Sequence, residues 1–252
     1  MNQGQSVQMN FSISKTVKWL VIINIAVWLG FQIILEQYVG VSFSRWFALY
    51  PAKFLYDFFL WQPLTYMFLH TYQPTHIFFN MLMLWFLGTE LENRWGRKFF
   101  LSYYLISGAG AGLIYCIGTW IYFLLKPGTT ALVIPVMGAS GAIFGLLLAY
   151  GIIFGERMIY VMGVFPMKAK FFVLIMGLVE LSSLLTSDVN GGDVAYLAHL
   201  GGLVSGYLTL VAWTRIQRSM WSQKAKKRNR NLRLVVDNEK QPKTGEGPKY
   251  WN

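Results

Sequence analysis

A serine flanked by glycines is the first candidate for chemistry in this chain of 252 residues, in the run Gly138-Ala139-Ser140-Gly141. Ser140 opens an apolar stretch that continues to Ala149, so any reaction at its hydroxyl would take place in apolar surroundings. A serine hydroxyl becomes a nucleophile when a neighbouring base takes its proton. The alternative needs no chemistry, because Gly141 and Gly145 are four residues apart and small residues at this spacing let membrane helices pack closely.

Three further polar side chains lie in apolar stretches and have the right types to complete a site. Histidine acts as a general base near neutral pH, so His199 could take the serine proton and later protonate a leaving amine. His76 and Asn80 are spaced i, i+4 on one face of a predicted helix and could donate hydrogen bonds to an oxyanion. Taken alone, each of the three could instead have only a structural role, as a hydrogen bond between neighbouring helices.

The elements that must hold these residues are predicted to lie in a membrane. Hydrophobic residues make up 55% of the chain and charged residues 13%, which is far more apolar than a soluble domain of this size. The length allows one bundle with tails, and no internal repeat indicates a second domain. Cys116 lies in an apolar stretch and is predicted to be a small core residue. No metal site and no cofactor are predicted.

Six apolar segments are predicted to cross the membrane as helices, for which a span requires about 20 residues. The predicted helices are 17–35, 74–91, 99–125, 140–154, 171–185 and 194–213. The first is too long for the core of a signal peptide, so we expect it to be retained. The predicted fold is an all-α polytopic bundle over residues 15–215, with a polar tail at 1–14 and a basic, disordered tail at 216–252.

Two connecting segments are predicted to lie at or inside the membrane surface. Residues 38–73 are rich in aromatic residues and interrupted by Pro51 and Pro63, which is typical of the membrane interface. Residues 131–137 are apolar, but Pro135 and Gly138 break any helix there. This segment is predicted to dip back into the membrane, which is tolerated only where protein or a water-filled cavity shields the backbone.

The placement of positive charge predicts the orientation. Six spans put both termini on one side, leaving Arg45, Lys53 and Lys126 on one face and the other 19 of the 22 lysines and arginines on the face of the termini. The positive-inside rule makes that second face cytoplasmic. The net charge of +11 therefore follows topology. The basic stretch 215–233 is predicted to contact anionic lipid headgroups, with nucleic-acid binding as the less favoured alternative.

With this orientation the candidate residues share one depth near the outer side. Ser140 begins its helix beneath the dipping loop, and His199 lies roughly 8 Å down at ~1.5 Å of rise per residue. His76 and Asn80 lie in the outer turns of their helix. Polar residues inside spans cost free energy and are functional hypotheses by default. Four of them at one depth on three helices favour a site over four separate helix contacts.

Glycines are predicted to bring the serine and His199 together. Two of them follow His199 at i+3 and i+7, opposite the pair that follows Ser140, and the two pairs are Gly202 with Gly206 and Gly141 with Gly145. The start of the serine helix adds backbone N–H groups and a positive dipole end, both suited to an oxyanion. Glu180 is the remaining intramembrane acid and is predicted to be a paired or water-facing structural group. The predicted catalytic unit is therefore a Ser-His dyad.

These residues belong to motifs that together resemble the rhomboid intramembrane serine proteases over roughly residues 15–215. The motifs are Trp61-Gln-Pro-Leu-Thr65 leading into Phe68-Leu-His70, His76-x-x-x-Asn80, Leu87-Gly88-x-x-x-Glu92 with Gly96, Gly138-x-Ser140-Gly141, and Ala198-His199-x-x-Gly202-x-x-x-Gly206. The combination is far more specific than a single Gly-x-Ser motif.

The resemblance implies a six-helix bundle around a hydrated cavity open to the outside. It implies that Ser140 is the nucleophile, that His199 is its partner, and that His76 and Asn80 belong to the oxyanion site. Substrates would be single-span membrane proteins cleaved near the outer end of their transmembrane segment. The short tails and minimal plan of six spans favour a bacterial inner membrane.

Two positions depart from the family's pattern. The family's Trp-Arg pair reads Trp61-Gln62 here, which leaves open how that loop is anchored. The aromatic residue one turn after the serine, often tyrosine in relatives, is Phe144, which can pack against an imidazole but has no hydroxyl.

Two other function classes compete with the endopeptidase. A catalytically inactive rhomboid-like protein would bind membrane clients, but such proteins have lost the dyad, whereas both Ser140 and His199 are present. A transporter would show inverted repeats or paired broken helices, and the sequence has neither.

Overall fold

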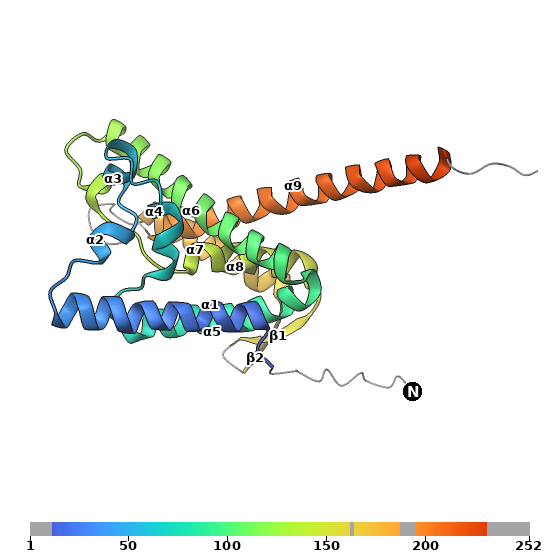
Figure 1. Ribbon diagram of the computed structural model, residues 1–252, viewed down its shortest axis with the longest axis horizontal. Helices are drawn as coiled ribbons and strands as arrows, with labels where there is room; N and C mark the ends of the chain where they lie inside the picture. Colours follow the sequence, from blue (N-terminus) through green and yellow to red (C-terminus); the bar gives the residue numbers. More distant parts are fainter. Residues whose placement is uncertain (1–11, 162–163, 187–194, 231–252) are drawn as a thin grey trace, which may run out of the picture. The chain divides into compact units, whose positions relative to one another are not determined.

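The computed structural model describes residues 12–161, 164–186 and 195–230, with side chains described as far as residue 224 (Figure 1). The chain divides into two units, Met1–Val211 and Ala212–Asn252, and the described part of the second is the last stretch of one helix. The elements are α1 (Lys15–Ala26), η1 (Val27–Tyr38), α2 (Ser44–Phe47), α3 (Pro51–Tyr56), α4 (Gln62–Thr65), η2 (Tyr66–Phe68), α5 (Pro74–Trp95), α6 (Arg97–Leu125), η3 (Ala131–Val133), α7 (Ser140–Ile153), β1 (Met158–Val161), β2 (Phe165–Lys168), α8 (Ala169–Thr186) and α9 (Ala195–Arg230).

Each of the six predicted helices is present as a helix. Within the described residues, four segments are long and apolar enough to cross a membrane, namely Lys15–Tyr38, Arg97–Leu125, Ala169–Thr186 and Ala195–Lys224. α7 is apolar but has only 14 residues, which at ~1.5 Å per residue is shorter than a bilayer core of about 30 Å. α5 carries charged residues at its end. Six complete crossings and the side of the termini therefore stay predictions.

The short helix α7 lies in the core of the first unit. Most of its residues are buried, and it packs on α5, α6 and α8. A helix that is apolar on all sides is suited to such a position. α1 lies along α5 on another side of the unit (Figure 1). The helix that begins at Ser140 is thus held from several directions.

Glycines let α9 approach α7 at backbone distance. A Cβ atom at Gly202 would overlap the carbonyl oxygen of Gly141, and one at Gly206 would lie 2.8 Å from the Cα of Gly145. On the α6 side, the Tyr103 hydroxyl donates to the Gly145 carbonyl over 2.7 Å. These contacts are backbone to backbone or backbone to a buried ring, so larger residues at the two glycine pairs would push the helices apart.

The segment from 131 to 139 is held by hydrogen bonds to the connection between α2 and α3, to α6 and to η2. Leu49 and Val136 form an antiparallel bridge with N–H···O distances of 3.1 and 3.0 Å. The Tyr115 hydroxyl donates to the Ile134 carbonyl over 2.8 Å, and the Gly138 N–H donates to the Tyr66 carbonyl over 2.9 Å. The irregular backbone that leads to Ser140 therefore has hydrogen-bond partners within the protein.

Gln62 anchors the aromatic segment, a role that the sequence left open. Its side chain is completely buried. Its Oε1 accepts a hydrogen bond from the Tyr50 N–H over 3.1 Å, and its Nε2 donates to the Trp46 carbonyl over 3.3 Å. The indole N–H of Trp61 donates to the same carbonyl over 2.9 Å. An uncharged amide thus bridges α2, α3 and α4.

Glu92, in the last turn of α5, binds the start of α1. Its carboxylate accepts hydrogen bonds from the backbone N–H groups of Thr16 and Val17 and from the hydroxyls of Ser14 and Thr16. The first N–H groups of a helix have no acceptor within the helix, and a carboxylate there also favours the positive dipole end. Glu92 therefore satisfies the first turn of α1.

Two features differ from the sequence prediction. β1 and β2 form an antiparallel hairpin, with Met158 opposite Lys168, in a fold predicted to be all-α. Lys168 and Lys170 both bind Glu156, and Arg157 binds Glu90, so ion pairs hold this connection. α9 also continues to Arg230, where a disordered tail from 216 was predicted. No proline or glycine interrupts residues 207–230, and lysine and arginine favour helix.

Some predictions fall outside the described residues. These are the tail at 1–11, the connection 187–194 with the predicted start of the sixth helix, and residues 231–252.

Candidate active site

Ser140 and His199 meet at the start of α7. The Ser140 Oγ lies 2.8 Å from the His199 Nε2, which is hydrogen-bonding distance. Ser140 is the first residue of α7, and His199 lies just over one turn into α9. The close contact of Gly141 with Gly202 is one residue beyond the serine and three beyond the histidine. The glycine packing therefore sets the separation of the two side chains.

Phe144 fixes the plane of the imidazole. Its ring stacks on the His199 ring with a centroid distance of 4.4 Å and an interplanar angle of 11°. Phe144 lies one turn after Ser140 on the same helix, so a single element supplies both the hydroxyl and the surface on which the imidazole rests. Phe144 therefore packs against the imidazole as the sequence predicted.

Gly138 lets His76 approach the serine. It has φ +133°, which L side chains rarely adopt, and a Cβ there would lie 3.1 Å from the His76 Cε1 and 3.6 Å from the Ser140 Oγ. The Nδ1 of His76 accepts a hydrogen bond from the Thr71 N–H over 3.1 Å. In a neutral imidazole the other nitrogen then carries the proton. His76 Nε2–H is therefore a hydrogen-bond donor beside Gly138.

Asn80 uses one of its amide hydrogens within its own helix. Its Nδ2 donates to the His76 carbonyl over 2.8 Å, and its Oδ1 is buried without a hydrogen-bond partner among the described residues. An amide carries two N–H donors. One donor thus stays available on a residue that lines the same cavity as Ser140.

A cavity of about 540 Å³ joins these side chains. It is lined from α5 and the segment before it, from the dipping loop, and from the starts of α7 and α9. The lining residues that bear on chemistry are Thr71, His76, Asn80, Ser140 and His199. The structure therefore brings all four sequence-predicted polar residues to one cavity.

Glu180, predicted to be a paired or water-facing structural group, is paired in the structure, and its partner is His199. Its Oε2 lies 2.9 Å from the His199 Nδ1, on the side of the imidazole away from Ser140. The carboxylate is buried in α8, with 7% of the residue exposed. The position of Glu180 along its helix could have indicated this contact. Glu180 lies six residues before the end of α8 at Thr186, or ~9 Å by helical rise, which is close to the depth predicted for His199.

Comparison with known proteins decides the family. The Rhomboid domain matches residues 58–216, well over half of the chain. The chain belongs to the rhomboid family. With its long apolar helices, this rhomboid is a multi-pass membrane protein.

The relatives of this rhomboid come from mitochondria and bacteria. Rhomboid protein 1, mitochondrial, of Saccharomyces cerevisiae is 33% identical over 133 residues, 53% of this chain and 36% of that protein. Rhomboid protease AarA of Providencia stuartii is 30% identical over 164 residues, 61% of this chain and 56% of the relative. Rhomboid protease GluP of Bacillus subtilis is 30% identical over 154 residues, 60% of this chain and 26% of the relative. The chain thus covers less than two thirds of the length of each.

The third histidine of this rhomboid, His70, has a different environment. It precedes α5, is completely buried, and its ring lies 5.2 Å from the His76 ring between centroids. Burial, and secondarily the neighbouring His76, lowers the pKa of His70 to about 3. The ring is therefore neutral and supports His76 by packing.

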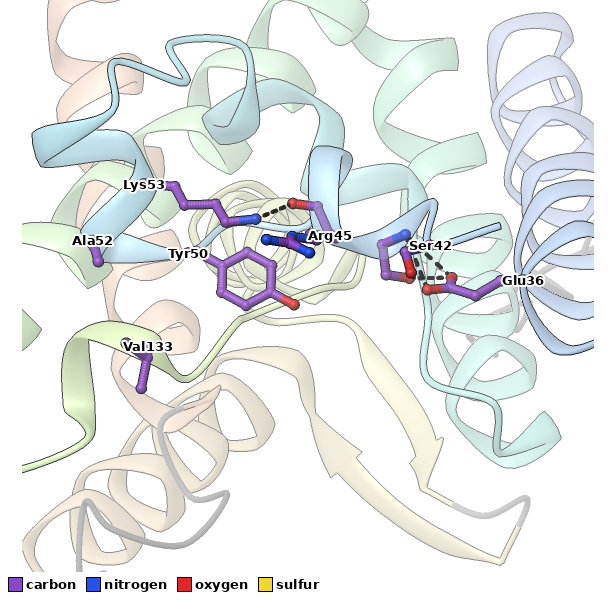
Figure 2. A pocket seen from close by; sticks show the side chains of 8 residues that line it. Glu36, Ser42, Arg45, Tyr50, Ala52, Lys53 and Val133 are labelled. Atoms are coloured by element: carbon purple, nitrogen blue, oxygen red, sulfur yellow. Dashed lines mark hydrogen bonds between the residues drawn. The ribbon is translucent and has the colours of Figure 1, made fainter. Parts of the chain in front are cut away.

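A second cavity in the rhomboid fold, of about 420 Å³, lies beside α2 and α3 (Figure 2). Lys53 Nζ donates to the Arg45 carbonyl over 2.6 Å and lies 4.6 Å from the centre of the Tyr50 ring. Glu36 accepts a hydrogen bond from the Ser44 hydroxyl over 2.6 Å. Its lining residues include serines but no histidine. A serine paired with a base is found at the first cavity.

Proposed function

We propose that this protein is an intramembrane serine endopeptidase that hydrolyses peptide bonds in or near the outer end of the transmembrane segments of single-span membrane proteins. The observation that carries the proposal is the 2.8 Å contact of the Ser140 Oγ with the His199 Nε2 at the start of a buried helix, beside a cavity. The rhomboid family and relatives named as rhomboid proteases support the same reaction class.

The reaction would follow the general course of serine hydrolases. His199 Nε2 takes the Ser140 proton as the Oγ attacks the scissile carbonyl, and returns it to the leaving amine. Water then attacks the acyl-enzyme with His199 again as base. The tetrahedral intermediate needs donors for its oxyanion. The backbone N–H at the start of α7, the His76 Nε2–H and the second Asn80 N–H have the chemistry for this task.

The surroundings proposed for the reaction follow from the charge distribution. The cavity would open to the outer side of a bacterial inner membrane, with the basic stretch 215–233 on the cytoplasmic face near anionic lipid headgroups. Labelling that segment with a membrane-impermeant reagent from outside intact cells would contradict this orientation if it succeeded.

The test is cleavage of a model single-span substrate by the full chain in liposomes, with the products identified by mass spectrometry. Wild type should cleave near the outer end of the segment, and Ser140→Ala and His199→Ala should each abolish cleavage. A fluorophosphonate probe should label wild type and not Ser140→Ala. Binding of the substrate without cleavage by wild type would favour the inactive client-binding class, and activity that survives Ser140→Ala would refute the mechanism.

A further inference from the structure

The carboxylate of Glu180 has no role in a Ser-His dyad, yet it lies against the catalytic imidazole. Its Oε2 is 2.9 Å from the His199 Nδ1, while the His199 Nε2 is 2.8 Å from the Ser140 Oγ. The three side chains come from α8, α9 and α7. We infer that Glu180 is a positioning residue for His199 and extends the pair to a Ser-His-Glu arrangement. This inference rests on the proposed function and deepens it.

The protonation pattern of the imidazole gives the first argument. To accept the Ser140 proton, His199 must have a free lone pair at Nε2, so its single proton must sit on Nδ1. A carboxylate at hydrogen-bonding distance from Nδ1 accepts that N–H and selects this tautomer. An ionised carboxylate cannot donate a proton, so the opposite tautomer would leave both Nδ1 and the carboxylate facing each other as acceptors.

The charge that develops in the reaction gives the second argument. When the Oγ proton moves to Nε2, the imidazole becomes a cation with protons on both nitrogens. A carboxylate in a site largely removed from water stabilises that cation more strongly than water would. The Nδ1 proton stays on His199, Glu180 stays ionised, and the Nε2 proton passes to the leaving amine. Glu180 thus acts only through His199.

The position of Glu180 in α8 gives the third argument. The side chains around it, including Leu178, Val179 and Leu181, are apolar and exposed on the outside of the unit, as suits contact with lipid. An acid in such a helix is costly unless it is paired. The lysines that flank the start of α8 bind Glu156. Within the part of the chain that the structure describes, the hydrogen bond to His199 offsets the cost of burying the carboxylate of Glu180.

A hydrogen bond that only joins α8 to α9 would give the same geometry. The test must therefore separate a positioning role from a purely structural one. We would compare wild type, Glu180→Gln and Glu180→Asp in liposomes with a single-span substrate, with Glu156→Gln as control, since it removes an exposed carboxylate outside the site. Glu180→Gln should lower kcat by about 10²- to 10⁴-fold with KM little changed, the upper figure being the loss known for the asparagine variant of a serine-protease triad. Glu180→Asp, which keeps the charge, should recover part of kcat, and Glu156→Gln should keep the kcat of wild type.

Structural damage has a different signature. Full kcat in Glu180→Gln would overturn the inference, and so would equal losses in Glu180→Gln and Glu180→Asp accompanied by a lowered thermal midpoint. Loss of kcat at an unchanged thermal midpoint, with partial recovery in Glu180→Asp, supports it.

A second readout is independent of activity. The chain has only three histidines, so ¹⁵N-histidine labelling would allow assignment of the His199 Nδ1–H resonance. A downfield Nδ1–H signal should be present in wild type and in Ser140→Ala and absent from Glu180→Gln. Its persistence in Glu180→Gln would overturn the inference. If wild type fails to cleave any substrate, the proposed function fails, whereas this signal still reports whether Glu180 sets the tautomer.

Discussion

Gly202→Ala tests whether helix packing sets the distance between Ser140 and His199. The new Cβ would lie 2.9 Å from the Gly141 carbonyl carbon and overlap its oxygen. Carbon atoms in contact prefer about 3.5–4.0 Å, and the obstacle is backbone, which cannot turn away as a side chain does. α7 and α9 must therefore separate locally by about 1 Å. That shift would lengthen the 2.8 Å Oγ···Nε2 contact beyond a normal hydrogen bond.

The expected loss of kcat is about 10²-fold, since a misplacement of about 1 Å can cost that much. The free energy of unfolding should also fall, because overpacking costs about 1–3 kcal/mol, while the better helix propensity of alanine returns about 1 kcal/mol at most. The assay is cleavage of a single-span substrate in liposomes, together with the thermal midpoint in detergent.

Gly177→Ala is the matched control. Gly177 lies within α8, and a Cβ there would meet Leu203 Cδ1 at 3.5 Å, an ordinary contact. This variant should keep wild-type kcat and should gain up to about 1 kcal/mol of stability. Wild-type kcat in Gly202→Ala would refute the reasoning, because it would mean that the serine and histidine do not depend on the glycine contact.

Three further predictions concern the oxyanion site, the loop anchor and the hairpin. Asn80→Ala should lower kcat by about 10²-fold or more without abolishing cleavage, as for the loss of one oxyanion donor; unchanged kcat would remove Asn80 from the site. Gln62→Ala should lower the free energy of unfolding by about 1–3 kcal/mol, because the part-buried Tyr50 N–H loses its acceptor and the Trp46 carbonyl keeps only the Trp61 indole as a donor. The exposed Gln37→Ala should have little effect, and equal denaturation curves for Gln62→Ala and wild type would contradict the anchor. Hydrogen bonds from its two lysine partners lower the pKa of Glu156 from 4.5 to about 2, so its stabilising effect is complete above pH 4.5 and is lost as the pH falls toward about 2. The difference in thermal midpoint between wild type and Glu156→Gln should therefore shrink over that range, and a difference that grows would refute the assignment.

The helices could be predicted from the sequence because hydropathy and length are local properties. The segment predicted at 171–185 is a helix at Ala169–Thr186, and the one predicted to begin at Ser140 begins there. The glycine spacings also carried information across the fold, since Gly141 and Gly202 do come into contact. In both cases the signal depends on residue size or polarity along one helix.

The hairpin and the contact of Glu180 with His199 could not be predicted in the same way. β1 and β2 have four residues each, which is too short for an alternating pattern to stand out, and their stability depends on partners such as Glu156 with Lys168. Helical rise gives the depth of Glu180 but not the direction in which it points around α8. That direction depends on how α8 rotates against α7 and α9, which is a property of packing and not of spacing along the chain.

The glycines at the contact of α7 with α9 connect the packing with the chemistry. Gly141 and Gly202 give up apolar side-chain contacts, and glycine lowers helix propensity by about 1 kcal/mol at each position relative to alanine. A bundle that needed only stability could fill this contact with larger side chains at a greater helix separation. The same separation would remove His199 from Ser140 and leave Glu180 without its partner. The close contact therefore makes sense where three polar groups must meet inside an apolar bundle, and Gly202→Ala should disturb catalysis more than it disturbs folding.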